Sequence, residues 1–131
     1  MKPSVGVGAL ILDQDKNILL VKRKRSPEAG CWSLPGGKVD YMETIENAVV
    51  REIKEELNID ITVKELLCVT NHIIKSEDIH YVAPTFLAEI TRGTVHNMEP
   101  QALESVQWFS IKDIPKNITI TTDNALKHLL I

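Results

Sequence analysis

Runs of apolar residues separated by polar stretches predict two strands near the N-terminus. Residues 5–12 and 18–21 are rich in β-branched and aliphatic residues, and residues 13–17 between them are polar and turn-forming. A β-hairpin is therefore the simplest interpretation. Residues 26–30 follow as a loop, and residues 32–34 form a short extended piece that ends at a backbone-breaking Pro-Gly-Gly sequence.

The strongest helical pattern lies between residues 44 and 57. Apolar residues recur there with the spacing of one helix face, and Thr44 is a suitable N-cap. Asn58 follows the last apolar residue, at the place where a left-handed residue would cap the C-terminus. The predicted buried face consists of Ile45, Ala48, Val49, Ile53 and Leu57.

Three further apolar runs, residues 59–70, 81–90 and 106–109, predict strands after this helix. Pro84 lies within the second run, and because proline cannot donate to a strand ladder, we expect an edge strand or a bulge there. A final helix is predicted for residues 123–130. Strands around a central helix, closed by a second helix, favour the α/β class and a mixed α/β sandwich.

Composition narrows the class of protein. The chain has 131 residues, of which 44% are hydrophobic and 25% charged, so we expect one compact globular domain over residues 1–131. No apolar run approaches the roughly 20 residues that span a bilayer, and residues 1–4 lack the features of a signal peptide. A cytoplasmic protein without membrane contact is expected. The net charge of −3 gives no support to nucleic-acid binding, which depends on many Lys and Arg contacts.

The cysteines and histidines show no metal-site spacing. Cys31 and Cys68 are far apart and have no CxxC partner, so reduced, packed thiols are expected rather than a zinc site. A structural or surface role is expected for the four histidines, which are His72, His80, His96 and His128.

Three glutamates of the predicted helix, Glu52, Glu55 and Glu56, are spaced so that their side chains converge at one edge of the apolar face. Like charges at such spacing cost roughly 0.2–0.5 kcal/mol per pair, and partial burial adds to that cost. A divalent cation with oxygen ligands would compensate, and Mg2+ suits chemistry on phosphates. The alternative is an ordinary solvated helix face that also includes Glu46.

The wider spacing favours the metal site. Gly37 is followed after five residues by Glu43, and after seven more by the sequence Arg-Glu-Ile-Lys-Glu-Glu-Leu-Asn-Ile of residues 51–59. This pattern resembles the Nudix box, Gly-x5-Glu-x7-Arg-Glu-U-x-Glu-Glu-x-Gly-U, where U is aliphatic. Asn58 replaces the final glycine of the box, which is a mild change because Asn also tolerates the left-handed conformation.

The resemblance extends to residues 32–37 before the box and to Trp108-Phe109 and Ile114-Pro115 near the end of the chain. It implies a Nudix-type α/β/α sandwich with a mixed β-sheet and a catalytic loop–helix–loop. Members of this family bind divalent cations in the loop–helix–loop and activate a water against phosphorus. The expected cofactor is therefore Mg2+, or Mn2+ in its place.

The resemblance also implies roles for the box residues. Glu52, Glu55 and Glu56 would bind the metal, together with the backbone carbonyl of Gly36, and either Glu52 or Glu56 would be the base. Gly37 would permit a close turn. The remaining two implied catalytic residues are Arg51, which would fix a box glutamate and lies one turn from Glu55, and Glu43, which would support the loop or help hold a metal.

Residues outside the box are open to two interpretations each. Arg23 would contact a substrate phosphate or would be a solvated charge at a strand end. Trp32 would stack on a base, although a packed role is preferred. Glu99 and Glu104 would supply a further metal-binding or base-activating carboxylate, or would be surface acids.

The box implies the reaction but not the nucleoside. Residues 30–37 and 99–109 look most like the MutT type, which hydrolyses nucleoside triphosphates to the monophosphate and pyrophosphate. ADP-ribose-type relatives tend to carry a proline soon after the box, whereas the first proline here is Pro84. The alternatives are hydrolysis of ADP-ribose, a nucleotide sugar or a dinucleoside polyphosphate, and a non-catalytic nucleotide-sensing module. Because many relatives are dimers, a homodimer is expected.

Overall fold

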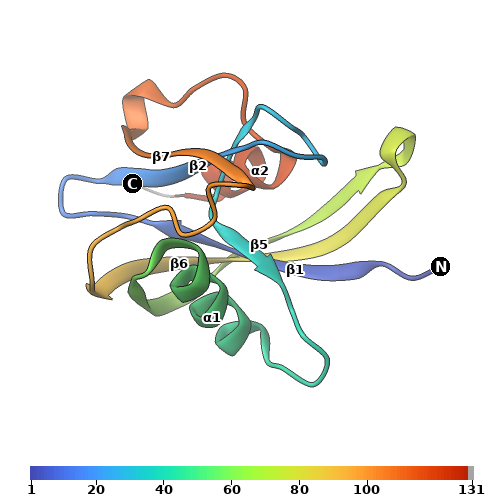
Figure 1. Cartoon of the computed structure of the whole chain (residues 1–131), viewed down its shortest axis with the longest axis horizontal. Coiled ribbons are helices and arrows are strands. Elements are labelled where there is room, and N and C mark those ends of the chain that lie inside the picture. The colour runs from blue at the N-terminus through green and yellow to red at the C-terminus, as the bar shows by residue number, and fades with distance from the viewer. Residues whose placement is uncertain (130–131) are drawn as a thin grey trace.

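The computed structural model describes residues 1–129 and contains two β-sheets and two α-helices (Figure 1). The larger sheet has the order β4-β1-β6-β5, and the smaller has the order β3-β2-β7. The strands are β1 (Ser4–Ile11), β2 (Asn17–Arg23), β3 (Trp32–Ser33), β4 (Gly36–Lys38), β5 (Asp60–Ile74), β6 (Ile79–Arg92) and β7 (Leu103–Ser110). The helices are α1 (Ile45–Leu57) and α2 (Ile120–His128), with short 3-10 turns at Lys75–Glu77 and Ile111–Asp113.

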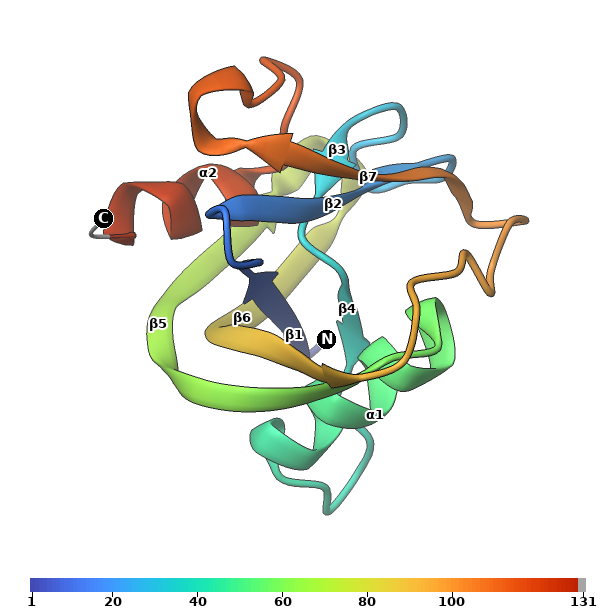
Figure 2. The ribbon, with the colours of Figure 1, turned by 90° about the vertical axis from the view of Figure 1, so that its left-hand side faces the viewer.

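The larger sheet is mixed, because β1 pairs in parallel with β6 while its other pairs are antiparallel. Figure 2 shows α1 and α2 on opposite sides of the strands. β5 and β6 form a long ribbon whose connecting turn projects to the right in Figure 1, on the same side as the N-terminus. The expected α/β class with a mixed sheet is confirmed. Within residues 1–129, neither helix is long and apolar enough to cross a membrane.

The predicted N-terminal hairpin is wrong. β1 and β2 belong to different sheets. They meet at the turn between them, where an isolated bridge joins Leu12 and Ile18 and the Asp13 N–H donates to the Asn17 carbonyl at 3.1 Å. Both strands are largely buried, with Ala9 to Ile11 and Ile18 to Leu20 at 0% exposure. A two-stranded hairpin cannot cover two such runs on both faces, so each strand takes its partners from elsewhere in the chain.

Pro84 lies in an interior strand, so the expectation of an edge strand is wrong. β6 runs between β1 and β5. On the β1 side the pairs stop at Val5 with Val82 and resume at Gly8 with Thr85, so no donor is needed from proline there. The nearest register shift lies on the partner strand, between Leu66 and Cys68 of β5, rather than on β6.

Helix α1 forms as its local sequence predicts. The Thr44 hydroxyl accepts a hydrogen bond from the Asn47 N–H at 3.1 Å, and Asn58 adopts the left-handed conformation with φ 60° and ψ 34°. Both predicted caps are confirmed. The apolar face is fully buried against the larger sheet at Ala48, Val49, Ile53 and Leu57.

Helix α2 begins earlier than predicted. Its N-cap is Thr119, whose hydroxyl accepts from the Thr122 N–H, and residue 130 of the predicted helix lies outside the described residues. The helix packs on a second core cluster that contains Leu10, Trp32 and Cys68. Both cysteines are free, with Cys68 buried and Cys31 half-buried.

Candidate functional site

Gly36 and Gly37 lie in β4, where the absence of side chains allows close packing against β1 and α1. A Cβ atom on Gly36 would overlap the carbonyl oxygen of Val7, and one on Gly37 would overlap the Glu52 carboxylate. Neither glycine has a positive φ. The expectation that Gly37 permits a turn is therefore corrected: it permits close approach of a carboxylate to the backbone.

Arg51 is the hub of the box. Its guanidinium donates two hydrogen bonds to the Glu43 carboxylate, at 2.8 and 2.9 Å, and one to Glu52 at 3.0 Å. It donates to both oxygens of Glu55, at 2.9 and 3.3 Å. It also donates to the backbone carbonyl of Lys38 at 3.0 Å. The loop before α1, through Glu43 and Lys38, and two carboxylates of the helix, Glu52 and Glu55, are thus tied to one cation.

These contacts change the ionisation of both partners. The hydrogen bonds from Arg51 lower the pKa of Glu43 to about 2, and hydrogen bonds to Glu43, Glu55 and Glu52 raise the pKa of Arg51. Both groups are therefore charged at any pH at which the protein would work.

Glu56 is in a very different environment from Glu43. It is only 7% exposed, and one carboxylate oxygen accepts a hydrogen bond from the Gly36 N–H at 3.2 Å. Burial, together with the charges of Glu99 and Glu52, raises the pKa of Glu56 to about 8. The pKa of Glu52 is also raised, first by burial, although Arg51 opposes that shift. The box therefore holds carboxylates that repel one another in a poorly solvated place.

A carboxylate cluster of this kind fits a hard divalent cation. Glu56 and Glu52 offer oxygen ligands, and the backbone of Gly36 lies beside Glu56. A cation would offset both the burial and the mutual repulsion that raise the two pKa values. Within residues 1–129 no three side chains are already in ligand geometry, and Arg51 holds both Glu52 and Glu55. Arg51 bonds to Oε1 of Glu52, so the other oxygen of that carboxylate, Oε2, would be the one to bind a metal while Arg51 holds the side chain in place.

The structure distinguishes the two later acids. Glu99 lies on the loop after β6, and its charge acts on both Glu52 and Glu56. That loop is fastened to the end of α1 by a hydrogen bond from the Met98 N–H to the Glu56 carbonyl at 2.9 Å. Glu104 instead forms an ion pair with Lys22 at 3.1 Å. Only Glu99 is brought to the box.

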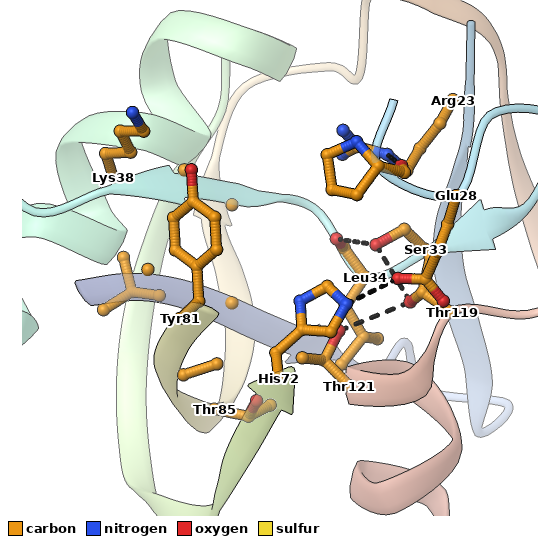
Figure 3. Close-up of a pocket in the computed structure, with 17 residues that line it drawn as sticks. Arg23, Glu28, Ser33, Leu34, Lys38, His72, Tyr81, Thr85, Thr119 and Thr121 are labelled. Atoms are coloured by element: carbon orange, nitrogen blue, oxygen red, sulfur yellow. Dashed lines mark hydrogen bonds and ion pairs between the residues drawn. The ribbon is translucent and has the colours of Figure 1, made fainter. Parts of the chain in front are cut away.

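A cavity of about 270 Å³ opens beside the box (Figure 3). Gly36, Gly37 and Lys38 of β4 line it, as does Arg23 at the end of β2. The Arg23 Nε donates to the Pro27 carbonyl at 2.7 Å, and the positive charge of Arg23 lowers the pKa of Glu56. Arg23 therefore lines the cavity with its positive charge close enough to act on Glu56, where a phosphate contact is feasible.

Trp32 does not line this cavity. It is 9% exposed, and its ring packs edge-on against Phe109 with centroids 4.8 Å apart. The hypothesis that Trp32 stacks on a base is therefore wrong. A ring that is buried in the core has no face exposed to a substrate base. The packed role, which the sequence favours, is the one that the structure shows.

The other end of the cavity was not predicted from the sequence. Glu28 and His72 meet there with 2.8 Å between Oε1 and Nε2, and Thr119 and Thr121 lie beside them (Figure 3). The residues are far apart in the sequence, and Glu28 was expected to be an ordinary loop residue. One signal was available: Thr70 and His72 are polar residues at the inward-facing positions of β5.

Comparison with known proteins decides the family. Residues 2–129 match the family model described as NUDIX domain. The chain belongs to the Nudix family. Its fold resembles the crystal structure of a MutT NUDIX hydrolase from Burkholderia pseudomallei, with a TM-score of 0.91 and 46% identity over 99% of this chain and 100% of that one.

Curated Nudix relatives carry different names. The chain is 36% identical to an ADP-ribose pyrophosphatase of Methanocaldococcus jannaschii over 116 residues, which are 88% of this chain and 67% of that protein. It is 38% identical to a CTP pyrophosphohydrolase of Escherichia coli over 103 residues, which are 76% and 73% of the two chains. The predicted membership of the MutT-like Nudix hydrolases is confirmed, and Nudix enzymes generally use divalent cations.

The buried Glu56 of this Nudix box predicts an unusual dependence of stability on pH. With divalent cations removed by a chelator, the folded protein holds a proton on Glu56 up to about pH 8, whereas the unfolded chain releases it near 4.5. The free energy of unfolding should therefore fall by a few kcal/mol as the pH rises through this range. Urea unfolding at several pH values measures it.

The matched variant for this measurement is Glu56→Gln, whose side chain is neutral at every pH. Its free energy of unfolding should change less between about pH 5 and pH 8 than that of the wild type. An equal fall in both proteins would show that other groups cause the dependence. Adding a divalent cation should stabilise the wild type most at the upper end of the range, where the carboxylate is charged.

Proposed function

We propose that this Nudix chain hydrolyses a nucleoside triphosphate, in its ribo or deoxy form, to the monophosphate and pyrophosphate with Mg2+. The observation that carries the proposal is the cavity beside the box. Its volume of about 270 Å³ lies just below the roughly 300–1,000 Å³ of sites that hold larger ligands, so it suits a base with its sugar. Gly36, Gly37 and Arg23 at its edge direct the phosphates towards the box.

Different side chains of the site have different roles in this proposal. Arg51 positions Glu43 and Glu52, and Arg23 offers a positive charge to the substrate phosphates. Mg2+, when bound, neutralises the diphosphate oxygens and makes water more acidic. Of the two candidate bases, Glu56 is the more deeply buried and its pKa is raised to about 8, which favours it as the acceptor of the proton from the attacking water. Glu99 is the additional carboxylate in this proposal.

Hydrolysis of ADP-ribose is the second candidate, because an ADP-ribose pyrophosphatase is 36% identical over most of the chain. A nucleotide sugar and a dinucleoside polyphosphate belong to the same alternative. A non-catalytic sensor is disfavoured, since all four box glutamates are present. A cytoplasmic location and a homodimer stay predictions from the sequence.

Product analysis separates these functions. The protein is incubated with Mg2+ and, in turn, nucleoside triphosphates, oxidised triphosphates, ADP-ribose and dinucleoside polyphosphates, and the products are resolved by chromatography. Pyrophosphate with a monophosphate from one triphosphate supports the proposal. Turnover of ADP-ribose alone, to two monophosphates, keeps the Nudix chemistry and rejects the proposed substrate. Binding of any nucleotide without turnover supports the sensor instead.

A further inference from the structure

We propose that Glu28 and His72 are positioning residues, whose buried contact fixes loop 24–31 and thereby holds Arg23 in the orientation that binds a substrate phosphate. Loop 24–31 is the segment between β2 and β3. The inference rests on the proposed function, because that proposal gives a substrate phosphate to Arg23. It assigns residues outside the Nudix box to the same reaction.

Glu28 and His72 are buried against each other. Glu28 Oε1 lies 2.8 Å from His72 Nε2, and the two side chains are 13% and 10% exposed. Because an ionised carboxylate only accepts hydrogen bonds, His72 Nε2 carries the hydrogen between them. Neither atom has another partner within the described residues. Separating the two side chains would therefore leave two buried polar atoms unpaired, which opposes any movement of the loop.

The contact joins loop 24–31 to two distant elements. His72 lies on β5 of the larger sheet, whereas the loop connects two strands of the smaller sheet. The second carboxylate oxygen of Glu28, Oε2, accepts a hydrogen bond from the Ile120 N–H at 2.9 Å, at the start of α2. Both oxygens of Glu28 are thus engaged, and the loop is fixed where it forms part of the cavity wall.

The backbone of Glu28 also indicates that its side chain holds the loop. Glu28 has a φ of 56°, in the left-handed region that residues with a Cβ atom adopt only uncommonly. Such a conformation is unfavourable and persists only where the surroundings enforce it. The contacts of the carboxylate with His72 and with the Ile120 N–H supply that enforcement.

Arg23 is held by the residues on either side of Glu28. Its Nε donates to the Pro27 carbonyl at 2.7 Å, and its backbone carbonyl accepts from the Gly30 N–H at 2.7 Å. Figure 3 shows Arg23 beside Glu28 on the same wall of the cavity. With Nε fixed, the planar guanidinium keeps one direction, which suits a phosphate. Movement of Pro27 would therefore misdirect the group that binds the phosphate.

The kinetic test is Glu28→Ala, which removes both carboxylate contacts. It should raise the KM for the hydrolysed triphosphate about 10-fold and leave kcat within about threefold of the wild type, because phosphate binding weakens while the box carboxylates are unchanged. Loss of folded protein would instead lower kcat at constant KM. In Glu28→Gln the amide can accept from the Ile120 N–H and donate to His72 Nε2, so KM should return towards the wild-type value.

A double-mutant cycle shows whether Glu28 acts through Arg23. In an Arg23→Gln background, Glu28→Ala should change KM by less than about twofold, because the group that it positions is already gone. A full 10-fold effect in that background would overturn the inference, as would an unchanged KM in Glu28→Ala alone.

A matched control for the lost charge is Glu77→Gln. Glu77 lies outside the cavity and accepts a hydrogen bond from Ser26 of the same loop at 2.7 Å. The glutamine keeps an oxygen for Ser26 while the charge is removed, so KM should equal that of the wild type. A rise in KM equal to that of Glu28→Ala would show that charge near the loop, rather than the buried contact, is the cause.

Hydrogen exchange at the Arg23 side chain separates this inference from the proposed function. The Arg23 Nε–H is followed by heteronuclear NMR without nucleotide or metal. It should be protected in the wild type and exchange about 10-fold faster or more in Glu28→Ala, or in His72→Phe if the first variant does not fold. That result supports the inference even if no triphosphate is hydrolysed. An unprotected Nε–H in the wild type, or equal protection in the variant, rejects it even if triphosphate hydrolysis is found.

Discussion

Replacing Glu56 with glutamine is expected to lower kcat by about 10³-fold or more while the fold persists, since removing a group that accepts a proton or stabilises charge typically costs about 10²–10⁴-fold. The physical reason is the environment of the carboxyl. Glu56 is buried between the glycine strand β4 and the loop that carries Glu99, and glutamine keeps the oxygen that accepts from the Gly36 N–H. The variant thus loses the charge and the proton acceptor but little shape.

Steady-state hydrolysis and circular dichroism measure the two parts of this prediction. The control is Glu46→Gln, which removes a carboxylate from the exposed first turn of the same helix and should leave kcat within a few-fold of the wild type. If Glu52→Gln and Glu56→Gln both kept full activity with Mg2+, the mechanism assigned to the box would be wrong.

Arg51→Lys is expected to lower kcat by about 10- to 100-fold and to lower the Tm by several degrees, even though the charge is conserved. A lysine ammonium is a point charge and cannot reproduce the planar fork that donates twice to Glu43 while reaching Glu52 and Glu55. Those carboxylates would then repel one another more strongly, and the loop before α1 would lose its hydrogen bonds to the helix.

Thermal unfolding and kinetics with Mg2+ test this variant against Lys54→Gln. Lys54 is an exposed cation of the same helix whose nearest acid, Asp60, is 3.7 Å away, so its loss should change little. The low pKa of Glu43 adds a second readout. Its stabilising pairing is present above about pH 4.5 and is lost as the pH falls towards 2, so Arg51→Gln should weaken this acid dependence. Wild-type behaviour in both assays would contradict the hub assignment.

Local features of the site were predictable because they depend on short separations in the sequence. The caps Thr44 and Asn58 are properties of a few neighbouring residues, and the structure has both. The approach of Arg51 to Glu55 follows from one turn of helix. The apolar face of α1 follows from periodicity, which is why Ala48, Val49, Ile53 and Leu57 are buried as expected.

Features that depend on strand pairing were not predictable in the same way. The hairpin between β1 and β2 was the simplest local interpretation, but it failed because the two apolar strands are buried in separate sheets. The prediction that Pro84 lies in an edge strand was wrong for a related reason. The pairs between β1 and β6 skip Pro84, so the interior strand needs no N–H donor at this residue. The functions of Gly37 and Trp32 also depend on what packs against them.

The amino-acid sequence by itself determined the helix with its caps, the spacing of Arg51 and the box glutamates, and through that spacing the family. Only the tertiary structure decided that Glu56 is buried, that Glu99 rather than Glu104 joins it, and that Glu28 meets His72. The physical reason is that helix spacing acts over a few residues. Burial and long-range pairing, which set charge and recognition here, arise only when distant strands and loops pack together.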